Sequence, residues 1–101
     1  MKVYIDSRVK SFMGALSEEL QEDVLEHIKL LESYGFALFP PTLKKLSGYK
    51  LWELRPQNAR LLLGKTKGGT AVVVGFLKTK NRTPLRYIKL AVQRLKIWQT
   101  K

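Results

Sequence analysis

Basic side chains, with a single carboxylate among them, dominate the second half of the sequence. Residues 44–101 contain fifteen lysines and arginines but one acid, Glu53, whereas residues 1–43 contain four basic and seven acidic residues. Cations without acidic partners repel one another and contribute nothing to folding, so a surface of this kind usually binds a polyanion. The alternative is a solvated surface that only keeps the protein soluble. The contrast between the two halves favours the polyanion.

Cleavage of RNA is the reaction that these residue types could support. It requires a base for the 2′-hydroxyl proton, cations that stabilise the charge developing on the phosphate, and an acid for the 5′-oxygen. Arginine suits the second role, because its planar guanidinium binds phosphate through two N–H groups. A lysine crowded by other cations has a lowered pKa and can transfer protons near neutral pH, and Glu53 is a second candidate base.

Five residues are candidates for this chemistry by their spacing. Glu53 and Arg55 are two apart in an expected strand and therefore share a face, and Arg60 joins them if it lies on the same face of the next strand. Lys78 and Lys80 follow the end of a third expected strand. Structural explanations remain open: Glu53 could simply neutralise an arginine across the sheet, and the lysines could belong to an ordinary charged loop.

The sequence lacks the residues that several other types of reaction require. The chain has no cysteine, and His27 is its one histidine. A disulfide, a thiolate nucleophile, a cysteine-ligated metal and a pair of catalytic histidines are therefore excluded. No metal-binding cluster is visible, so we expect a metal-independent reaction without a cofactor. His27 lies in an acidic helical segment and is interpreted as a surface residue.

The sequence also bears on where the protein works. No apolar run approaches the ~20 residues that a membrane span needs. The basic first residues are followed by Asp6, which interrupts any signal-peptide core. We therefore expect a cytoplasmic protein that does not bind membranes.

Two helices are predicted in the first half, after a short strand at Lys2–Ile5. Apolar residues recur at helical spacing from residue 9 to residue 16 and again from residue 20 to residue 31. Pro40 and Pro41 predict an extended connector over residues 36–42. Residues suited to helix ends flank both helices: Asp6 or Ser7, Ser17 and Gly35.

Three strands and a helix are predicted in the second half. The strands are Lys50–Arg55, Ala59–Lys65 and Thr70–Lys78, and the glycines of Thr66–Gly69 predict a hairpin between the last two. Thr83 as cap and Pro84 as first residue predict the start of the final helix. The order indicates one α+β domain over residues 1–101, with the N-terminal helices packed on a three- to four-stranded antiparallel sheet that also carries the C-terminal helix.

Three segments resemble the RelE/HigB-like toxin superfamily. They are the run LSGYKLWELR at Leu46–Arg55, the strand RLLL that begins at Arg60, and VGFLKTKNRTP at Val74–Pro84. Within the superfamily the chain is most similar to the phage-derived Gp49-like group, whose members carry similar LWELR and GF-K-TP segments. Together with the preceding helices, the likeness covers nearly the whole chain.

The resemblance implies a compact fold with a central antiparallel sheet flanked by helices. It also implies a toxin that cleaves mRNA in the ribosomal A site and a helix-turn-helix antitoxin that holds it inactive. DNA would be contacted only through that antitoxin. By position, Arg60 matches the strand arginine that many members use at the phosphate, and Arg55 matches the basic residue of the preceding strand. The family's final basic cluster falls at Lys78, Lys80 and Arg82.

The chain departs from the family pattern in two ways. Some members have lysine where Glu53 stands, and others end with a catalytic tyrosine or histidine beyond the third strand. Tyr87 lies in that vicinity, but a terminal histidine is absent. The resemblance therefore leaves the general acid and base unassigned.

The resulting hypothesis is a ribosome-dependent mRNA endonuclease of a type II toxin–antitoxin system. Its catalytic candidates are Glu53, Arg55, Arg60, Lys78 and Lys80, and replacing Arg60 by alanine should abolish growth arrest without unfolding the domain. Six further residues are expected to bind RNA: Lys44, Lys45, Lys50, Arg82, Arg86 and Tyr87. The rivals are a non-catalytic RNA-binding module and a phage structural or regulatory protein that binds an acidic partner.

Overall fold

Three helices and five strands follow one another in the computed structural model, which describes all residues 1–101. Their order is β1 (Val3–Ile5), α1 (Ser7–Gly14), α2 (Glu18–Tyr34), a 3₁₀ turn (Gly35–Ala37), β2 (Leu43–Lys45), β3 (Trp52–Leu54), β4 (Ala59–Thr66), β5 (Gly69–Leu77) and α3 (Leu85–Gln99). The predicted α+β class is confirmed. None of the helices combines the length and the apolar composition that a membrane crossing requires.

The sheet has five strands in the order β1-β5-β4-β3-β2 and is mixed. β2 to β5 form an antiparallel meander, as the sequence predicts, whereas β1 pairs with β5 in parallel. The sheet therefore has one or two strands more than predicted, and β1 makes it mixed where a purely antiparallel sheet was expected. β2 gave no signal because it is three residues long and two of them, Lys44 and Lys45, are exposed lysines.

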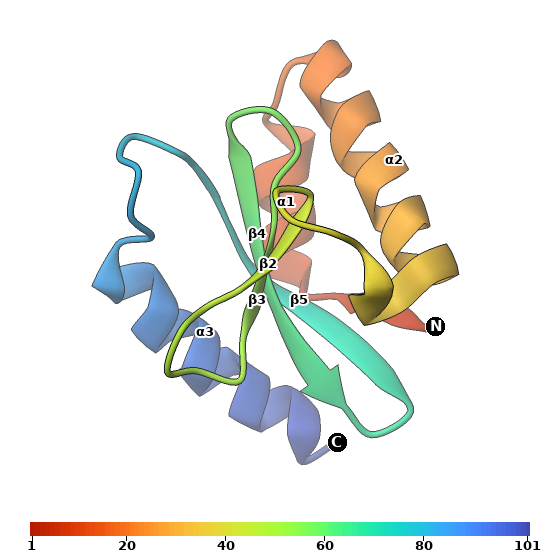
Figure 1. Cartoon of the computed structure of the whole chain (residues 1–101), viewed down its shortest axis with the longest axis vertical. Coiled ribbons are helices and arrows are strands. Elements are labelled where there is room, and N and C mark those ends of the chain that lie inside the picture. Colours follow the sequence, from red (N-terminus) through yellow and green to blue (C-terminus); the bar gives the residue numbers. More distant parts are fainter.

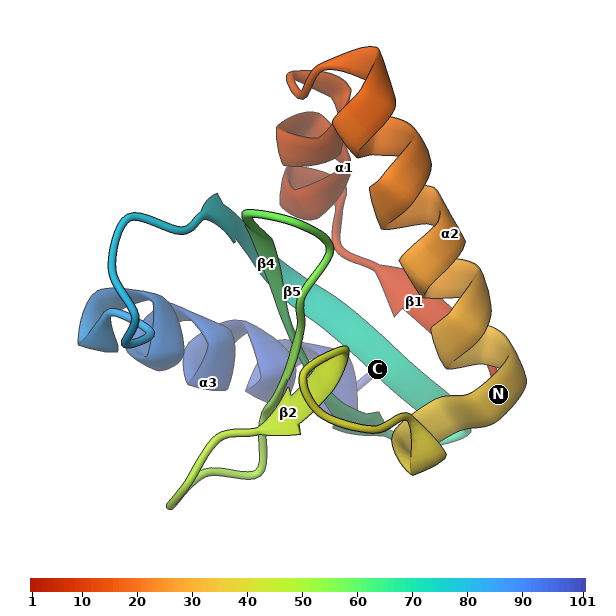
Figure 2. The same cartoon turned by 45° about the horizontal axis from the view of Figure 1, so that its top comes forward.

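Helices cover both faces of the sheet, α1 and α2 on one side and α3 on the other (Figures 1 and 2). Alternation along the strands divides the apolar side chains between the two layers. Leu54 and Leu61 pack towards α1 and α2, whereas Leu51 and Leu62 pack towards α3. Glu53 lies opposite Leu62 in the β3–β4 pairing, so its side chain is on the α3 side.

The ends of α1 and α2 agree with the sequence prediction. Asp6 accepts a hydrogen bond from the Arg8 amide and caps α1, and Ser17 Oγ accepts one from the Leu20 amide and caps α2. Gly35 follows α2 with a φ of 57°, a conformation that favours glycine. Residues 35–37 then form a 3₁₀ turn, so the connector is less extended than Pro40 and Pro41 suggested.

The start of α3 differs from the prediction. Pro84, and not Thr83, is the capping residue, and no side chain caps the helix. The Pro84 carbonyl accepts the first helical hydrogen bonds, from the amides of Tyr87 and Ile88. The side chain of Thr83 is thereby left for another contact, at the site described below.

A buried carboxylate joins the N-terminal region to α3. Asp6 accepts hydrogen bonds from Arg8 Nε (2.8 Å) and Arg8 Nη2 (2.9 Å), and from the indole Nε1 of Trp98 (3.0 Å). The hydrogen bonds from the Arg8 guanidinium hold the pKa of Asp6 well below its usual value of 3.8, and the Trp98 indole adds to this effect against the opposing effect of burial. Asp6 therefore favours the folded state when it is ionised.

Replacing Asp6 by asparagine should lower the free energy of unfolding at pH 7 by about 2 kcal/mol, because the hydrogen bonds to a charged acceptor are lost. Since asparagine also caps helices well, the cap at α1 should survive. The pKa of Asp6 is lowered in the folded state, so its contribution is complete above pH 3.8 and is lost as the pH falls further. In urea unfolding, the difference in free energy of unfolding between wild type and Asp6→Asn should become smaller below that pH. A difference that does not change with pH would show that the charge of Asp6 does not contribute to stability.

Candidate functional site

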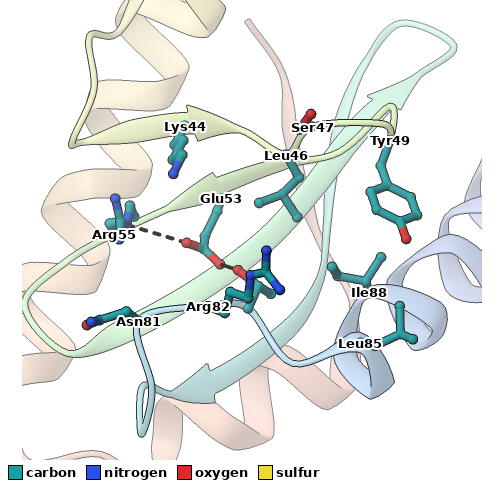
Figure 3. Close-up of a pocket in the computed structure, with 11 residues that line it drawn as sticks. Lys44, Leu46, Ser47, Tyr49, Glu53, Arg55, Asn81, Arg82, Leu85 and Ile88 are labelled. Carbon is teal, nitrogen blue, oxygen red and sulfur yellow. Dashed lines mark hydrogen bonds and ion pairs between the residues drawn. The ribbon is translucent and has the colours of Figure 1, made fainter.

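The main pocket, of about 550 Å³, lies between the β2–β3 hairpin, the loop before α3 and the first turns of α3 (Figure 3). Three cations, one acid, four apolar or aromatic residues and three neutral polar residues line it: Lys44, Arg55, Arg82, Glu53, Leu46, Tyr49, Leu85, Ile88, Ser47, Asn81 and Thr83. Three cations against one carboxylate make the pocket attractive to an anion. Its apolar wall gives room for a nucleoside beside that anion.

Glu53 is 4% exposed and is the centre of the site (Figure 3). Its Oε1 lies 3.4 Å from Arg55 Nε and 3.8 Å from Arg60 Nε, and its Oε2 accepts a hydrogen bond of 2.6 Å from Thr83 Oγ1. The convergence of Glu53, Arg55 and Arg60 on one face of the sheet therefore follows the alternation predicted from the sequence. Both carboxylate oxygens are occupied, so Glu53 ties β3 to β4 and to the loop before α3.

Arg60 is 7% exposed and does not line the main pocket. Its Nη1 donates to the carbonyl of Gln57 (2.7 Å), in the turn that precedes β4, and to that of Ala59 (2.8 Å), the first residue of β4. Burial lowers the pKa of Arg60, and the charge of Arg55 adds to this effect, while Glu53 opposes it. Arg60 is thus held by backbone acceptors and a carboxylate, outside the lining of the main pocket.

Arg55 has more freedom to bind a ligand. Its side chain is 22% exposed and lines the main pocket, yet its Nε is buried and has no hydrogen-bond partner. The 3.4 Å approach to Glu53 is an ion pair without good hydrogen-bond geometry. Arg55 is therefore weakly held by the protein, and the exposed part of its side chain can bind an anion in the pocket.

Two of the other cations predicted to bind RNA reach the main pocket. Lys44 pairs with Glu53 across β2 and β3, so it points to the same side of the sheet. Its neighbour Lys45 points to the opposite face, where its Nζ lies 5.7 Å from the ring centre of Trp52. Arg82 reaches the pocket from the loop before α3 (Figure 3).

The remaining predicted residues lie outside the main pocket. Lys78 and Lys80 lie in the loop that follows β5, and the Lys78 amide donates to the Asn58 carbonyl. Lys50 lines a separate hollow near the end of α3. Arg86 lies over the ring of Tyr87, which in turn stacks on Phe76 at 4.2 Å. These residues can extend a basic surface around the pocket but do not converge with Glu53.

Sequence reasoning missed four polar or aromatic residues of the pocket: Ser47, Tyr49, Asn81 and Thr83. Thr83 was not recognised as a site residue because the sequence pattern assigned it to the cap of the final helix. Its hydroxyl in fact contacts Glu53, thirty residues earlier in the sequence. Ser47 and Tyr49 belong to the turn between β2 and β3, and no local pattern shows that this turn faces α3. Only the topology of the meander brings them to the site.

Thr83→Val should loosen the loop that carries Arg82, because valine has the shape of threonine without the hydroxyl that Glu53 accepts. We expect a loss of about 1–2 kcal/mol of stability and larger backbone motion over residues 79–83, measured as NMR order parameters, since a hydrogen bond to a carboxylate is lost. Thr83→Ser keeps the hydroxyl and is the matched control. Equal order parameters in both variants would show that the hydrogen bond does not hold the loop.

The chain matches one protein family. Residues 11–96, from within α1 to near the end of α3, match the family described as phage-derived protein Gp49-like (DUF891). The resemblance that the sequence motifs predicted is confirmed by this match. No curated protein matches the chain.

Proposed function

We propose, from the premise that the chain belongs to the Gp49-like family of phage-derived proteins, that it is the toxin of a type II toxin–antitoxin system. The toxin would cleave mRNA on the ribosome without a metal or cofactor and so inhibit translation. The observation that carries the proposal is the main pocket, where a buried Glu53 holds Arg55 beside a nucleotide-sized space with three cations on its wall.

The roles follow from the positions of the side chains. Arg55 would bind the phosphate at which the strand is cut and stabilise the charge that develops on its oxygens. Lys44 and Arg82 approach the same space from β2 and from the loop before α3, and would neutralise the phosphate further. Tyr49 offers an aromatic surface on which a base can stack. Lys78, Lys80 and Arg86 would bind the backbone of the RNA outside the pocket.

Glu53 is the one carboxylate in the pocket and is our candidate for the base that takes the 2′-hydroxyl proton. Thr83 fixes its Oε2, which leaves Oε1 as the oxygen to accept the proton. Oε1 now faces the two arginines, so a phosphate that draws Arg55 towards the pocket would remove one of these two ion-pair contacts and leave Arg60 as the other. The basic surface would be covered by an acidic segment of a helix-turn-helix antitoxin when the toxin is held inactive.

A non-catalytic RNA-binding module is the second candidate. The observation in its favour is that both oxygens of Glu53 are occupied and that no histidine lines the pocket. Such a module would bind RNA with strong salt dependence and leave it intact.

Induced expression in a bacterium tests the proposal directly. We expect growth arrest together with new mRNA 5′ ends at positions related to codons, mapped before the cells die. Normal growth and intact transcripts, at a protein level confirmed by immunoblotting, would reject the toxin. RNA that copurifies with the protein in those cells would then favour the binding module.

A further inference from the structure

A second pocket, of about 310 Å³, adjoins the first. It is lined by Pro41, Thr42, Arg55, Gln57 and Arg60, without an acidic or a large apolar side chain. Arg55 lines both pockets and is the only residue to do so, which makes it the wall between them. The two spaces differ in character, because the main pocket has an apolar side and the second pocket has none.

The residues behind the second pocket are short of one negative charge. Two guanidiniums, of Arg55 and Arg60, face one carboxylate, that of Glu53. Burial lowers the pKa of Arg60, and the charge of Arg55 adds to this effect against the opposing effect of Glu53. The buried Nε of Arg55 has no hydrogen-bond partner, so Glu53 holds this guanidinium only by a 3.4 Å ion pair. An anion in the second pocket would supply the missing charge.

We infer that the second pocket is a phosphate subsite, and that the ligand is a single-stranded polynucleotide whose consecutive phosphates lie on either side of Arg55. The inference rests on the proposed function, and adds to it the path of the strand. The main pocket takes a nucleoside and its phosphate, and the next phosphate occupies the second pocket. A polar lining of this kind suits a phosphate and the ribose attached to it, whereas a base would find no apolar surface there.

Gln57→Glu is the variant that tests the subsite. The substitution keeps the shape of the side chain and places a carboxylate on the wall of the second pocket only. The Gln57 side chain is exposed and makes no hydrogen bond, so the fold should be unaffected. Asn58→Asp is the matched control, because it makes the same change of charge at the next residue, which is also exposed but lines neither pocket.

The probes are short 2′-deoxy oligonucleotides, which cannot be cleaved through a 2′-hydroxyl. A dinucleoside with one phosphate is compared with a trinucleoside with two, by NMR titration at several salt concentrations. For the wild type, the second phosphate should raise the affinity about tenfold and steepen the log–log salt dependence by about 0.7, the value for one more phosphate contact in a single strand. Gln57→Glu should abolish that gain in affinity, while Asn58→Asp should keep it.

Three outcomes would overturn the inference. Equal effects of Gln57→Glu and Asn58→Asp would mean general attraction by the basic surface and no subsite. Binding of both probes with the same affinity would mean that the second phosphate has no site, while arrest and mRNA cleavage in cells would leave the toxin proposal intact. Failure of both probes to bind, in a protein that causes neither arrest nor cleavage, would reject the subsite and the proposed function together.

Discussion

Arg55→Ala is expected to reduce RNA cleavage about 100-fold or more, the effect typical of removing one donor that stabilises charge in a transition state. The side chain lines the main pocket, and its buried Nε has no hydrogen-bond partner inside the protein. Cells expressing the variant should grow, and the mapped 5′ ends should disappear. The midpoint of thermal unfolding should hardly change, because Arg60 remains as the ion-pair partner of Glu53.

The matched control for this prediction is Lys67→Ala. Lys67 is exposed in the β4–β5 turn and lines neither pocket, so the control removes the same charge at a distance from the site. Arg55→Lys should give an intermediate activity, because it keeps the charge but loses the two-pronged contact with phosphate. Full growth arrest by Arg55→Ala would exclude this side chain from the reaction. Similar losses in Arg55→Ala and Lys67→Ala would point to net charge as the cause.

The parts of the site that lie on regular strands could be predicted from sequence. Glu53 alternates with Trp52 and Leu54 on β3, and Arg55 continues the alternation directly after the strand, so a period of two settles which residues share a face. Arg60 lies two residues before Leu62, which pairs with Glu53, so the same period of two along β4 places Arg60 on that face. The β4–β5 hairpin does not fix this placement, because its register shifts between Leu62 and Leu63. The alternation along each strand is therefore the local rule that is sufficient here.

Contacts made by loops could not be predicted in the same way. The Thr83–Glu53 hydrogen bond depends on how residues 78–84 cross the end of the sheet, and nothing local encodes that path. Lys78 and Lys80 looked equivalent to Arg82 in sequence, yet Arg82 alone of the three lines the main pocket. The parallel pairing of β1 with β5 is likewise a long-range event, made after the chain has passed through both helices and the meander. The composition shows which half of the sequence is basic, but the topology of the fold determines which of these cations face the pocket.

Arg60→Met should destabilise the domain by about 3 kcal/mol, at the lower end of the range for breaking a buried ion pair from one side. The variant leaves the Gln57 and Ala59 carbonyls without their donor, and leaves Glu53 with Arg55 alone. Methionine keeps much of the volume of the arginine stem, so the loss should come from polar contacts and not from a cavity. Urea unfolding of Arg60→Met and Arg55→Ala, measured side by side, should therefore separate two arginines that look alike in sequence.

From the sequence, Arg60 was predicted to be a phosphate ligand whose removal leaves the fold intact. The destabilisation expected for Arg60→Met argues against the second part of that prediction. Because Arg60 is 7% exposed and its Nη1 is committed to the backbone, a loss of toxicity in Arg60→Ala would by itself say little about catalysis. Arg60→Lys is the informative variant: a lysine can still pair with Glu53 and bond one carbonyl, so stability should recover in part. If Arg60→Lys were as stable as wild type yet inactive, Arg60 would contact the substrate directly. If stability and activity recovered together, its role would be to hold Glu53 and the turn in place for Arg55.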